Sequence, residues 1–284
     1  MIPQQRSRMS TDLITAALNR LKAGTSRVEL VHKPYTGWPH PRPSPHSLTG
    51  SAESPLATGV SPYPGRVAVL DSSFNPPTLA HRALASLPSA ASPTEARLLL
   101  LSVRNADKTP RPGDASPVQR VEMMVLLARE IGAAVGLIDA PAFVQKANLL
   151  RAALPAEAQL IFVQGIDTLQ RFLEPRYYGD GSTQAMHAAL RRFFDPDGEN
   201  SRVICARRAI ELGKPCCESA ILETAQEWLK ADRIKIVDMD HGLQNLSSSE
   251  VRAKVRARDN TWREVVPNDI SEYIEEHGLY LNPT

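Results

Sequence analysis

The stretch that decides the fold is RVAVLDSSFNPPTLAH, residues 66–81. It begins with the apolar run 67–70, continues through small polar residues and two adjacent prolines, and ends at His81, where a helical pattern starts. A short apolar run followed by turn-forming residues is typical of a buried strand. Proline fixes φ and donates no backbone hydrogen bond, so the loop is stiff and can hold the backbone N–H groups of the neighbouring residues in a fixed orientation. The stretch predicts a strand, a rigid loop and a helix with His81 in its first turn, where free amides favour phosphate.

Further short apolar runs follow, separated by helical patterns. The expected strands are 66–71, 97–103, 134–139, 159–164, 202–206 and 233–238. One helix between them has a clear start, with Ser116 as its cap, Pro117 at the first helical position and Gln119 completing a capping box. This alternation predicts an α/β fold, a Rossmann-like doubly wound parallel sheet with helices on both faces. Ligands of such sheets bind beyond the carboxyl ends of the strands.

The first 65 residues differ from the rest. Residues 10–22 have apolar side chains at helical spacing, and Ser10 or Thr11 can cap the start of that helix. Its apolar face comprises Leu13, Ile14, Ala17, Leu18 and Leu21. Residues 34–64 are rich in Pro, Ser, Thr and Gly and predict a mobile linker or insertion, which includes Trp38. The expected organisation is a helical appendage over 1–33, a Pro/Ser-rich linker over 34–65 and one domain over 66–284.

Composition excludes few classes of function, but it limits the kinds of binding partner that we expect. An apolar content of 42% suffices for a sizeable core, and a net charge of +2 gives no support for a nucleic-acid partner. No apolar run approaches the roughly 20 residues that a membrane-spanning helix needs, and the N-terminus lacks a signal-peptide core. Cys205, Cys216 and Cys217 form neither a metal-ligand spacing nor a disulfide framework. We therefore expect a cytoplasmic or nuclear protein without a membrane partner.

Two motifs resemble those of a known family. Ser73-Phe74-Asn75-Pro76-x-Thr78-x-x-His81 is similar to the signature of nucleotidylyltransferases of the H/T-x-G-H type, in the Thr-containing form of eukaryotic nicotinamide mononucleotide adenylyltransferases. The second motif of that superfamily is a late Ser-Ser-Thr-x-x-Arg box, which LSSSEVR, residues 246–252, resembles. From the residues alone, the second stretch is a helix start, with Ser247 and Glu250 as a capping box. Together, in an α/β chain, the two motifs favour a phosphate site.

The resemblance runs from about residue 66 to the C-terminus and implies roles for single residues. The phosphate-binding residues that it implies are Ser73, Phe74, Thr78, His81, Ser248, Ser249 and Arg252, of which Thr78, His81 and Arg252 are the expected catalytic residues. Within FVQGIDTLQRF, the resemblance implies that Gly165 lets the protein backbone approach the nucleotide and that the Asp167 carboxylate accepts hydrogen bonds from the ribose hydroxyls. The residues that the resemblance implies for acceptor binding are Lys108, Arg208 (with Arg207 adjacent), and Tyr177 or Tyr178.

The sequence departs from the family at the base pocket and at one loop position. Ser72 stands where the family has glycine and can crowd a ligand that expects bare backbone. The tryptophan expected after the third strand is missing, and only Phe143 is available there. Tyr177 or Tyr178 replaces the later one, so an aromatic face for stacking remains. These departures leave adenylyl transfer better supported than the identity of the acceptor. The N-terminal helix and linker have no counterpart in the compact enzyme of the family and favour a divergent, fungal-type branch.

The implied reaction is transfer of AMP from ATP to nicotinamide mononucleotide, giving NAD and pyrophosphate. His81 would donate to the α-phosphate, with Thr78 beside it, and Mg²⁺ would be bound through phosphate oxygens rather than by protein ligands. The attacking phosphate is already ionised near neutral pH, so no catalytic base is expected. Two alternatives stay open: an enzyme of the same fold that uses another phosphorylated acceptor or hydrolyses ATP, and a nucleotide-binding regulatory module without turnover. The expected partners are small molecules only.

Overall fold

The computed structural model describes residues 3–40, 65–87, 96–104, 113–207 and 218–281 of the 284-residue chain. In these residues seven strands form one sheet in the order β1-β4-β3-β2-β5-β6-β7. The strands are β1 (Val28–His32), β2 (Arg66–Asp71), β3 (Ala96–Ser102), β4 (Ala134–Ile138), β5 (Gln159–Gly165), β6 (Arg202–Arg207) and β7 (Ile234–Asp238). β1 runs antiparallel to β4, and the other described pairings are parallel. The six predicted strands and the Rossmann-like fold are confirmed.

The strand order reverses between β2 and β5. β2 pairs with β3 on one side and with β5 on the other, in the register Leu70↔Val163. The chain therefore leaves β2 and β5 at neighbouring points on the carboxyl edge of the sheet. From β2 it continues through a loop into α2 (Leu79–Ser86), and from β5 it passes directly into α5 (Ile166–Phe172). A parallel sheet binds its ligands at such a switch point.

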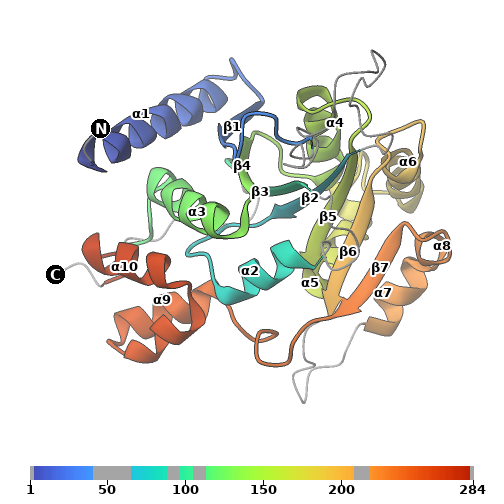
Figure 1. The fold of residues 1–284 in the computed structure, drawn as a ribbon. Coiled ribbons are helices and arrows are strands. Elements are labelled where there is room, and N and C mark those ends of the chain that lie inside the picture. The colour runs from blue at the N-terminus through green and yellow to red at the C-terminus, as the bar shows by residue number, and fades with distance from the viewer. Residues whose placement is uncertain (1–2, 41–64, 88–95, 105–112, 208–217, 282–284) are drawn as a thin grey trace, which may run out of the picture.

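Helices cover both faces of the sheet (Figure 1). One face packs against α1 (Pro3–Lys22), α2 and α3 (Pro117–Ile131), and the C-terminal α9 (Ser248–Arg256), η4 (Asn260–Val265) and α10 (Asn268–Glu276) pack beside α3. The other face packs against α4 (Phe143–Ala153), α5, η3 (Pro175–Tyr177), α6 (Thr183–Phe194), α7 (Glu218–Thr224) and α8 (Gln226–Lys230). Side chains alternate between the two cores along a strand: Leu98 and Leu100 face the second, Leu99 and Leu101 the first. The predicted start of α3, capped by Ser116, is confirmed.

The N-terminal segment contributes a strand that the sequence prediction missed. β1 extends the sheet beyond β4, and α1 packs against α3 with Ile14, Ala17 and Leu21 each 1% exposed. Leu13, predicted on the same apolar face, is 63% exposed because the buried stripe follows the 14–17–21 spacing and leaves it on the flank. α1 also begins at Pro3, so Thr11 lies inside the helix and neither Ser10 nor Thr11 caps its start.

Trp38 corrects the expected extent of the mobile segment. The sequence predicts it within the Pro/Ser-rich linker, but it is 4% exposed and belongs to the hydrophobic core that also contains side chains of α4 and α6. A side chain of that size buries enough apolar surface to order the few residues around it. Residues 41–64, the remainder of the predicted linker, lie outside the described residues, as do Cys216 and Cys217. Cys205 is buried in β6, and burial raises the pKa of its thiol to about 12.

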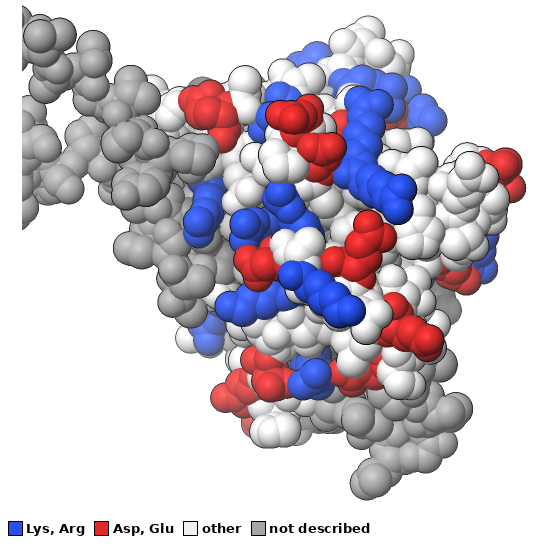
Figure 2. Space-filling model, turned by 90° about the vertical axis from the view of Figure 1, so that its right-hand side faces the viewer, with Lys and Arg blue, Asp and Glu red and all other residues white. Residues whose placement is uncertain are grey.

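The face beside β7 carries mixed charge. Figure 2 shows basic and acidic side chains interspersed over it rather than gathered by sign. β7 is an edge strand, and its Lys235 and Asp238 are exposed. Charged side chains on an edge strand discourage pairing with a strand of another chain. In the described part of the chain, no helix has the length and apolar character needed to cross a membrane.

Candidate active site

The loop after β2 is held in an unusual backbone conformation. Phe74 has φ of 44°, a region that residues with a Cβ rarely adopt, and its side chain is fully buried. The Asn75–Pro76 peptide bond is cis, and Thr78 then precedes the first residue of α2. The ring of Phe74 packs against the ring of His81 with centroids 5.1 Å apart. The predicted rigid loop therefore delivers His81 to the first turn of α2, at the carboxyl edge of the sheet.

The His81 ring is hydrogen-bonded at both nitrogens. The backbone N–H of Thr78 donates to Nδ1 at 3.0 Å, and the Thr78 hydroxyl lies 2.8 Å from the same nitrogen. Nε2 lies 2.9 Å from the hydroxyl of Ser72. The predicted pair Thr78 and His81 thus forms one unit, in which Thr78, itself fully buried, fixes the ring.

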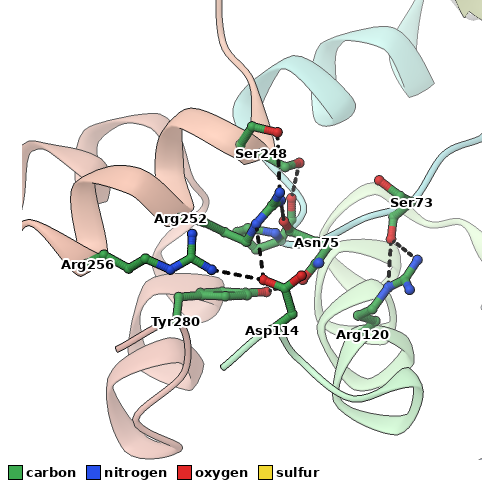
Figure 3. A network of polar contacts seen from close by, with 10 residues as sticks. Ser73, Asn75, Asp114, Arg120, Ser248, Arg252, Arg256 and Tyr280 are labelled. Atoms are coloured by element: carbon green, nitrogen blue, oxygen red, sulfur yellow. Dashed lines mark hydrogen bonds and ion pairs between the residues drawn. The ribbon is translucent and has the colours of Figure 1, made fainter. Parts of the chain in front are cut away.

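The second motif contacts the first one directly (Figure 3). Ser247 caps α9 by accepting from the Glu250 N–H at 3.1 Å, as predicted. The Ser248 hydroxyl donates to the Pro76 carbonyl at 2.8 Å across 172 positions of sequence. Arg252 donates to the Asn75 carbonyl at 2.6 Å, and its guanidinium also lies 3.3 Å from the Ser249 hydroxyl. The start of α9 therefore lies against the loop that carries His81.

A polar network on the far side of that loop was not predicted from the sequence (Figure 3). Arg120 of α3 donates twice to the Ser73 carbonyl, at 2.9 and 2.6 Å. Burial lowers the pKa of Arg120, and the nearby charges of Tyr280 and Asp114 oppose that shift. An arginine in the second turn of an amphipathic helix is usually solvated, so only the three-dimensional contact identifies its role.

Asp114 and Tyr280 complete this network. The Asp114 carboxylate pairs with Arg252 at 3.4 Å and with Arg256 at 3.2 Å. The Tyr280 hydroxyl donates to the side-chain oxygen of Asn75 at 2.8 Å, and burial raises the pKa of this tyrosine. Three carbonyls and one side chain of the loop are thus held by α3, α9 and the C-terminal segment.

A cavity of about 480 Å³ opens beside Ser72 and Ser73. Its aromatic wall consists of Phe143, Phe172, Tyr177 and Tyr178. Tyr177 is 37% exposed, whereas Tyr178 is 7% exposed and donates its hydroxyl to the Phe172 carbonyl; burial raises the pKa of Tyr178. The remaining lining residues are Asp71, Ser72, Ser73, Ser102, Pro141, Ala142, Gln145, Lys146, Thr168, Arg171 and Arg176. The predicted aromatic residues Phe143, Tyr177 and Tyr178 therefore share one cavity.

The cavity wall contains a buried ion pair that sequence reasoning missed. Lys146 of α4 pairs with Asp71, the residue that ends β2, and the two side chains are only 5% and 10% exposed. The Lys146 ammonium also lies 5.1 Å from the centre of the Phe143 ring. Lysine is rarely buried without a partner, and the sequence offers no sign that Asp71 supplies one. Asp71 precedes the first motif, so the pair links that motif to α4.

The other predicted residues lie outside these contacts. Gly165 ends β5, and Asp167 lies in the first turn of α5, directly before the cavity residue Thr168. Arg207 pairs with Glu218 at 2.7 Å and with Asp238 at 2.8 Å. Lys108 and Arg208, both predicted to bind the acceptor, lie outside the described residues.

The chemistry of the site suits a metal that is held by its substrate. Within the described ranges, no three His, Cys, Asp or Glu side chains lie close enough together to hold a metal ion. Asp71, the carboxylate in the cavity wall, is paired with Lys146. A Mg²⁺ ion keeps several waters and is commonly bound through substrate phosphates, which fits a site built from hydroxyls and cations.

Comparisons with known proteins agree on one group. A protein of Schizosaccharomyces pombe named as a nicotinamide mononucleotide adenylyltransferase is 28% identical over 218 residues, 73% of this chain and 83% of that one. A Bordetella petrii protein named as a nicotinate-nucleotide adenylyltransferase is 27% identical over 76% of this chain and 98% of its own. No protein-family model matches this chain.

The fold has a solved counterpart. The nicotinic acid mononucleotide adenylyltransferase of Plasmodium falciparum, complexed with NaAD, superposes with a TM-score of 0.54 at 14% sequence identity, over 76% of this chain and 97% of that one. This likeness shows the fold. In sequence, the chain is a divergent, fungal-like relative of the nicotinamide and nicotinate mononucleotide adenylyltransferases, which are nucleotidyltransferases.

Proposed function

We propose that this protein transfers AMP from ATP to nicotinamide mononucleotide, giving NAD and pyrophosphate. One observation carries the proposal: the second motif contacts Asn75 and Pro76 of the loop that carries His81, beside an aromatic-walled cavity at the switch point of the sheet. The relatives named for this activity and for the nicotinate reaction support adenylyl transfer in NAD biosynthesis. The cavity volume of about 480 Å³ lies in the range of small-molecule sites.

In the proposed reaction a phosphate oxygen of the mononucleotide attacks the α-phosphorus of ATP. The new O–P bond forms as the bond to pyrophosphate breaks in line, and no proton must be removed because the attacking phosphate is ionised. Catalysis then consists of positioning and of stabilising charge on the α-phosphate oxygens. His81 donates there through Nε2–H, an assignment supported by the N–H of Thr78 that occupies Nδ1.

On the pyrophosphate side we assign Ser248, Ser249 and Arg252. The contact of Arg252 with the Asn75 carbonyl means that it positions the loop before it can bind anything else. Binding of β- and γ-phosphates requires its guanidinium to exchange part of its contact with Asn75 or Asp114 for phosphate oxygens. Mg²⁺ supplies further charge neutralisation when bound to these phosphates.

On the acceptor side the aromatic wall stacks the pyridine ring. Phe143, Tyr177 and Tyr178 supply the faces, and the tied hydroxyl of Tyr178 keeps its ring in place. Asp167 is assigned to ribose hydroxyls, with Gly165 next to the nucleotide backbone. Lys108 and Arg208 are assigned to the acceptor phosphate.

The altered aromatic wall of the cavity favours a second candidate acceptor of the same chemical class as nicotinamide mononucleotide. Pro141 and Phe143 line the region after β4, where the resembling family has tryptophan, so the ring pocket differs in shape. Nicotinate mononucleotide is the nearest such acceptor and is the substrate named for several relatives.

The test is an acceptor panel. The purified protein is incubated with ATP, Mg²⁺ and nicotinamide mononucleotide, nicotinate mononucleotide or other phosphorylated acceptors, and dinucleotide and pyrophosphate are measured by chromatography. We expect NAD from nicotinamide mononucleotide, with a loss of about 100-fold or more in His81→Ala and little change in His277→Ala, an exposed histidine at the end of α10. Release of phosphate without dinucleotide, or nucleotide binding without turnover, would replace this proposal by ATP hydrolysis or a regulatory module.

A further inference from the structure

We infer that the Ser72 hydroxyl is a hydrogen-bond donor to the phosphate of the acceptor nucleotide, a role that rests on the proposed function. Ser72 occupies the position at which the resembling family has glycine. It lines the acceptor cavity, and its hydroxyl also contacts the proposed catalytic histidine. In the proposed reaction, Ser72 therefore lies between the α-phosphate of ATP, which His81 would contact, and the acceptor phosphate in the cavity.

The His81 ring determines how the Ser72 hydroxyl is used. A backbone N–H can only donate, so the 3.0 Å contact from Thr78 requires a lone pair on Nδ1 of His81. The neutral ring then carries its hydrogen on Nε2. Because Ser72 Oγ lies 2.9 Å from Nε2, it accepts that hydrogen, and its own hydroxyl hydrogen takes no part in this bond.

The position of Ser72 keeps this donor beside the cavity. The Ser72 backbone N–H donates to the Leu100 carbonyl at 3.2 Å, so the residue is fixed to β3 and only its side chain can rotate. When ATP binds, an α-phosphate oxygen takes the Nε2 hydrogen of His81 in place of Ser72 Oγ. The hydroxyl hydrogen of Ser72 is available to an acceptor phosphate both before and after that exchange.

The charges around Ser72 suit an anion. The neighbouring Asp71 carboxylate would repel a phosphate, but its ion pair with the buried Lys146 offsets its charge. The other charged side chains that line the cavity are Arg171 and Arg176. A hydroxyl that donates to an ionised phosphate forms a charge-assisted bond, roughly twice as strong as one between neutral groups.

The experiment separates acceptor binding from ATP binding. In Ser72→Ala and Ser72→Gly we expect the KM for the acceptor mononucleotide to rise about tenfold or more, with the KM for ATP changed less than about threefold. Ser72→Thr keeps the hydroxyl and should recover most of the loss. Ser102→Ala is the matched comparison: Ser102 lines the same cavity, but its single hydroxyl hydrogen is engaged by the Arg104 and Ala140 carbonyls, at 2.8 and 2.7 Å, so its effect should be smaller.

Two results would overturn the inference. An unchanged acceptor KM in Ser72→Ala shows that the hydroxyl does not contact the phosphate. A gain in turnover in Ser72→Gly shows instead that serine only obstructs His81. If the wild-type protein forms no dinucleotide, the proposed function has failed, and the inference is then judged by calorimetric titration of the mononucleotides. Weaker binding to Ser72→Ala than to wild type supports it, whereas equal binding, or none to wild type, rejects it.

Discussion

The substitution Asp114→Asn tests whether the network behind the first motif stabilises the site. Asp114 is 10% exposed and lies between Arg252 and Arg256, which are 16% and 26% exposed. Asparagine keeps the shape but removes the negative charge, which leaves these two guanidiniums without their shared counter-ion, and Arg252 also lies close to the charge of Arg120. Removing one partner of a fully buried pair costs about 3–5 kcal/mol. The partial exposure of Arg252 and Arg256 reduces that figure, and we expect a loss of about 2–3 kcal/mol in the free energy of unfolding.

The same substitution should lower activity more than an equal loss of stability elsewhere. Arg252 contacts both Asp114 and the Asn75 carbonyl, so an unpaired Arg252 positions the His81 loop less well. Stability is measured by urea unfolding with linear extrapolation, and turnover with saturating ATP at a temperature where the variant is folded. A cycle with Arg256→Gln should give a coupling energy of about 1 kcal/mol, because that pair is removed in both single variants.

The control is Asp232→Asn. Asp232 pairs with Arg202 at 2.9 Å, but the side chains are 73% and 39% exposed, so the change should stay within about 0.5 kcal/mol. If Asp114→Asn changed stability as little as Asp232→Asn, the network would not be a stabilising one. Unchanged turnover in a destabilised Asp114→Asn would refute the link between the network and His81.

Three further expectations concern the sheet and its edges. Lys146→Met leaves the Asp71 carboxylate buried and unpaired and should cost about 3 kcal/mol, most of which the double variant with Asp71→Asn regains in urea unfolding. Burial, aided by the charge of Arg129, lowers the pKa of His32 in the folded protein. Below pH ~6.5 the unfolded chain therefore binds more protons than the folded one, and the free energy of unfolding falls as the pH drops. His32→Gln should flatten this fall between about pH 7 and 5. Leu21→Ala in α1 should cost about 2–4 kcal/mol in thermal or urea unfolding and the exposed Leu13→Ala no more than about 0.5 kcal/mol, whereas equal effects would contradict the packing of α1.

The parallel part of the sheet was predictable because its signal is local. Each of its strands is a short apolar run between turn-forming residues, and alternation with helices fixes the fold class without knowledge of any contact. β1 has no such signal. Its five residues are all only partly buried, and the strand exists because it pairs with β4, more than a hundred positions later. Pairing across that separation cannot be inferred from residues 28–32 alone.

The same distinction explains which parts of the site were found. The motif residues His81 and Arg252 carry their chemistry in type and spacing, so the sequence indicated both. Arg120 contacts Ser73, 47 positions away, and Asp114 contacts Arg256, 142 positions away; neither has a local pattern that distinguishes it from a surface charge. Lys146 was missed for the same reason, since its burial depends on meeting Asp71 across 75 positions.

The site has two halves, the loop that carries His81 and the aromatic-walled cavity, and different parts of the fold hold each of them in place. The loop with His81 is held from behind by α3, α9 and Tyr280, whereas the acceptor cavity is walled by α4, α5 and the segment around Tyr178. The halves meet at the loop residues Ser72 and Ser73, which line the cavity. Under the proposed function, a change of aromatic residue in the wall should therefore alter ring recognition without moving the phosphate side. By contrast, a change at Ser72 should act on both halves at once, because its hydroxyl contacts His81 while its side chain lines the proposed acceptor cavity.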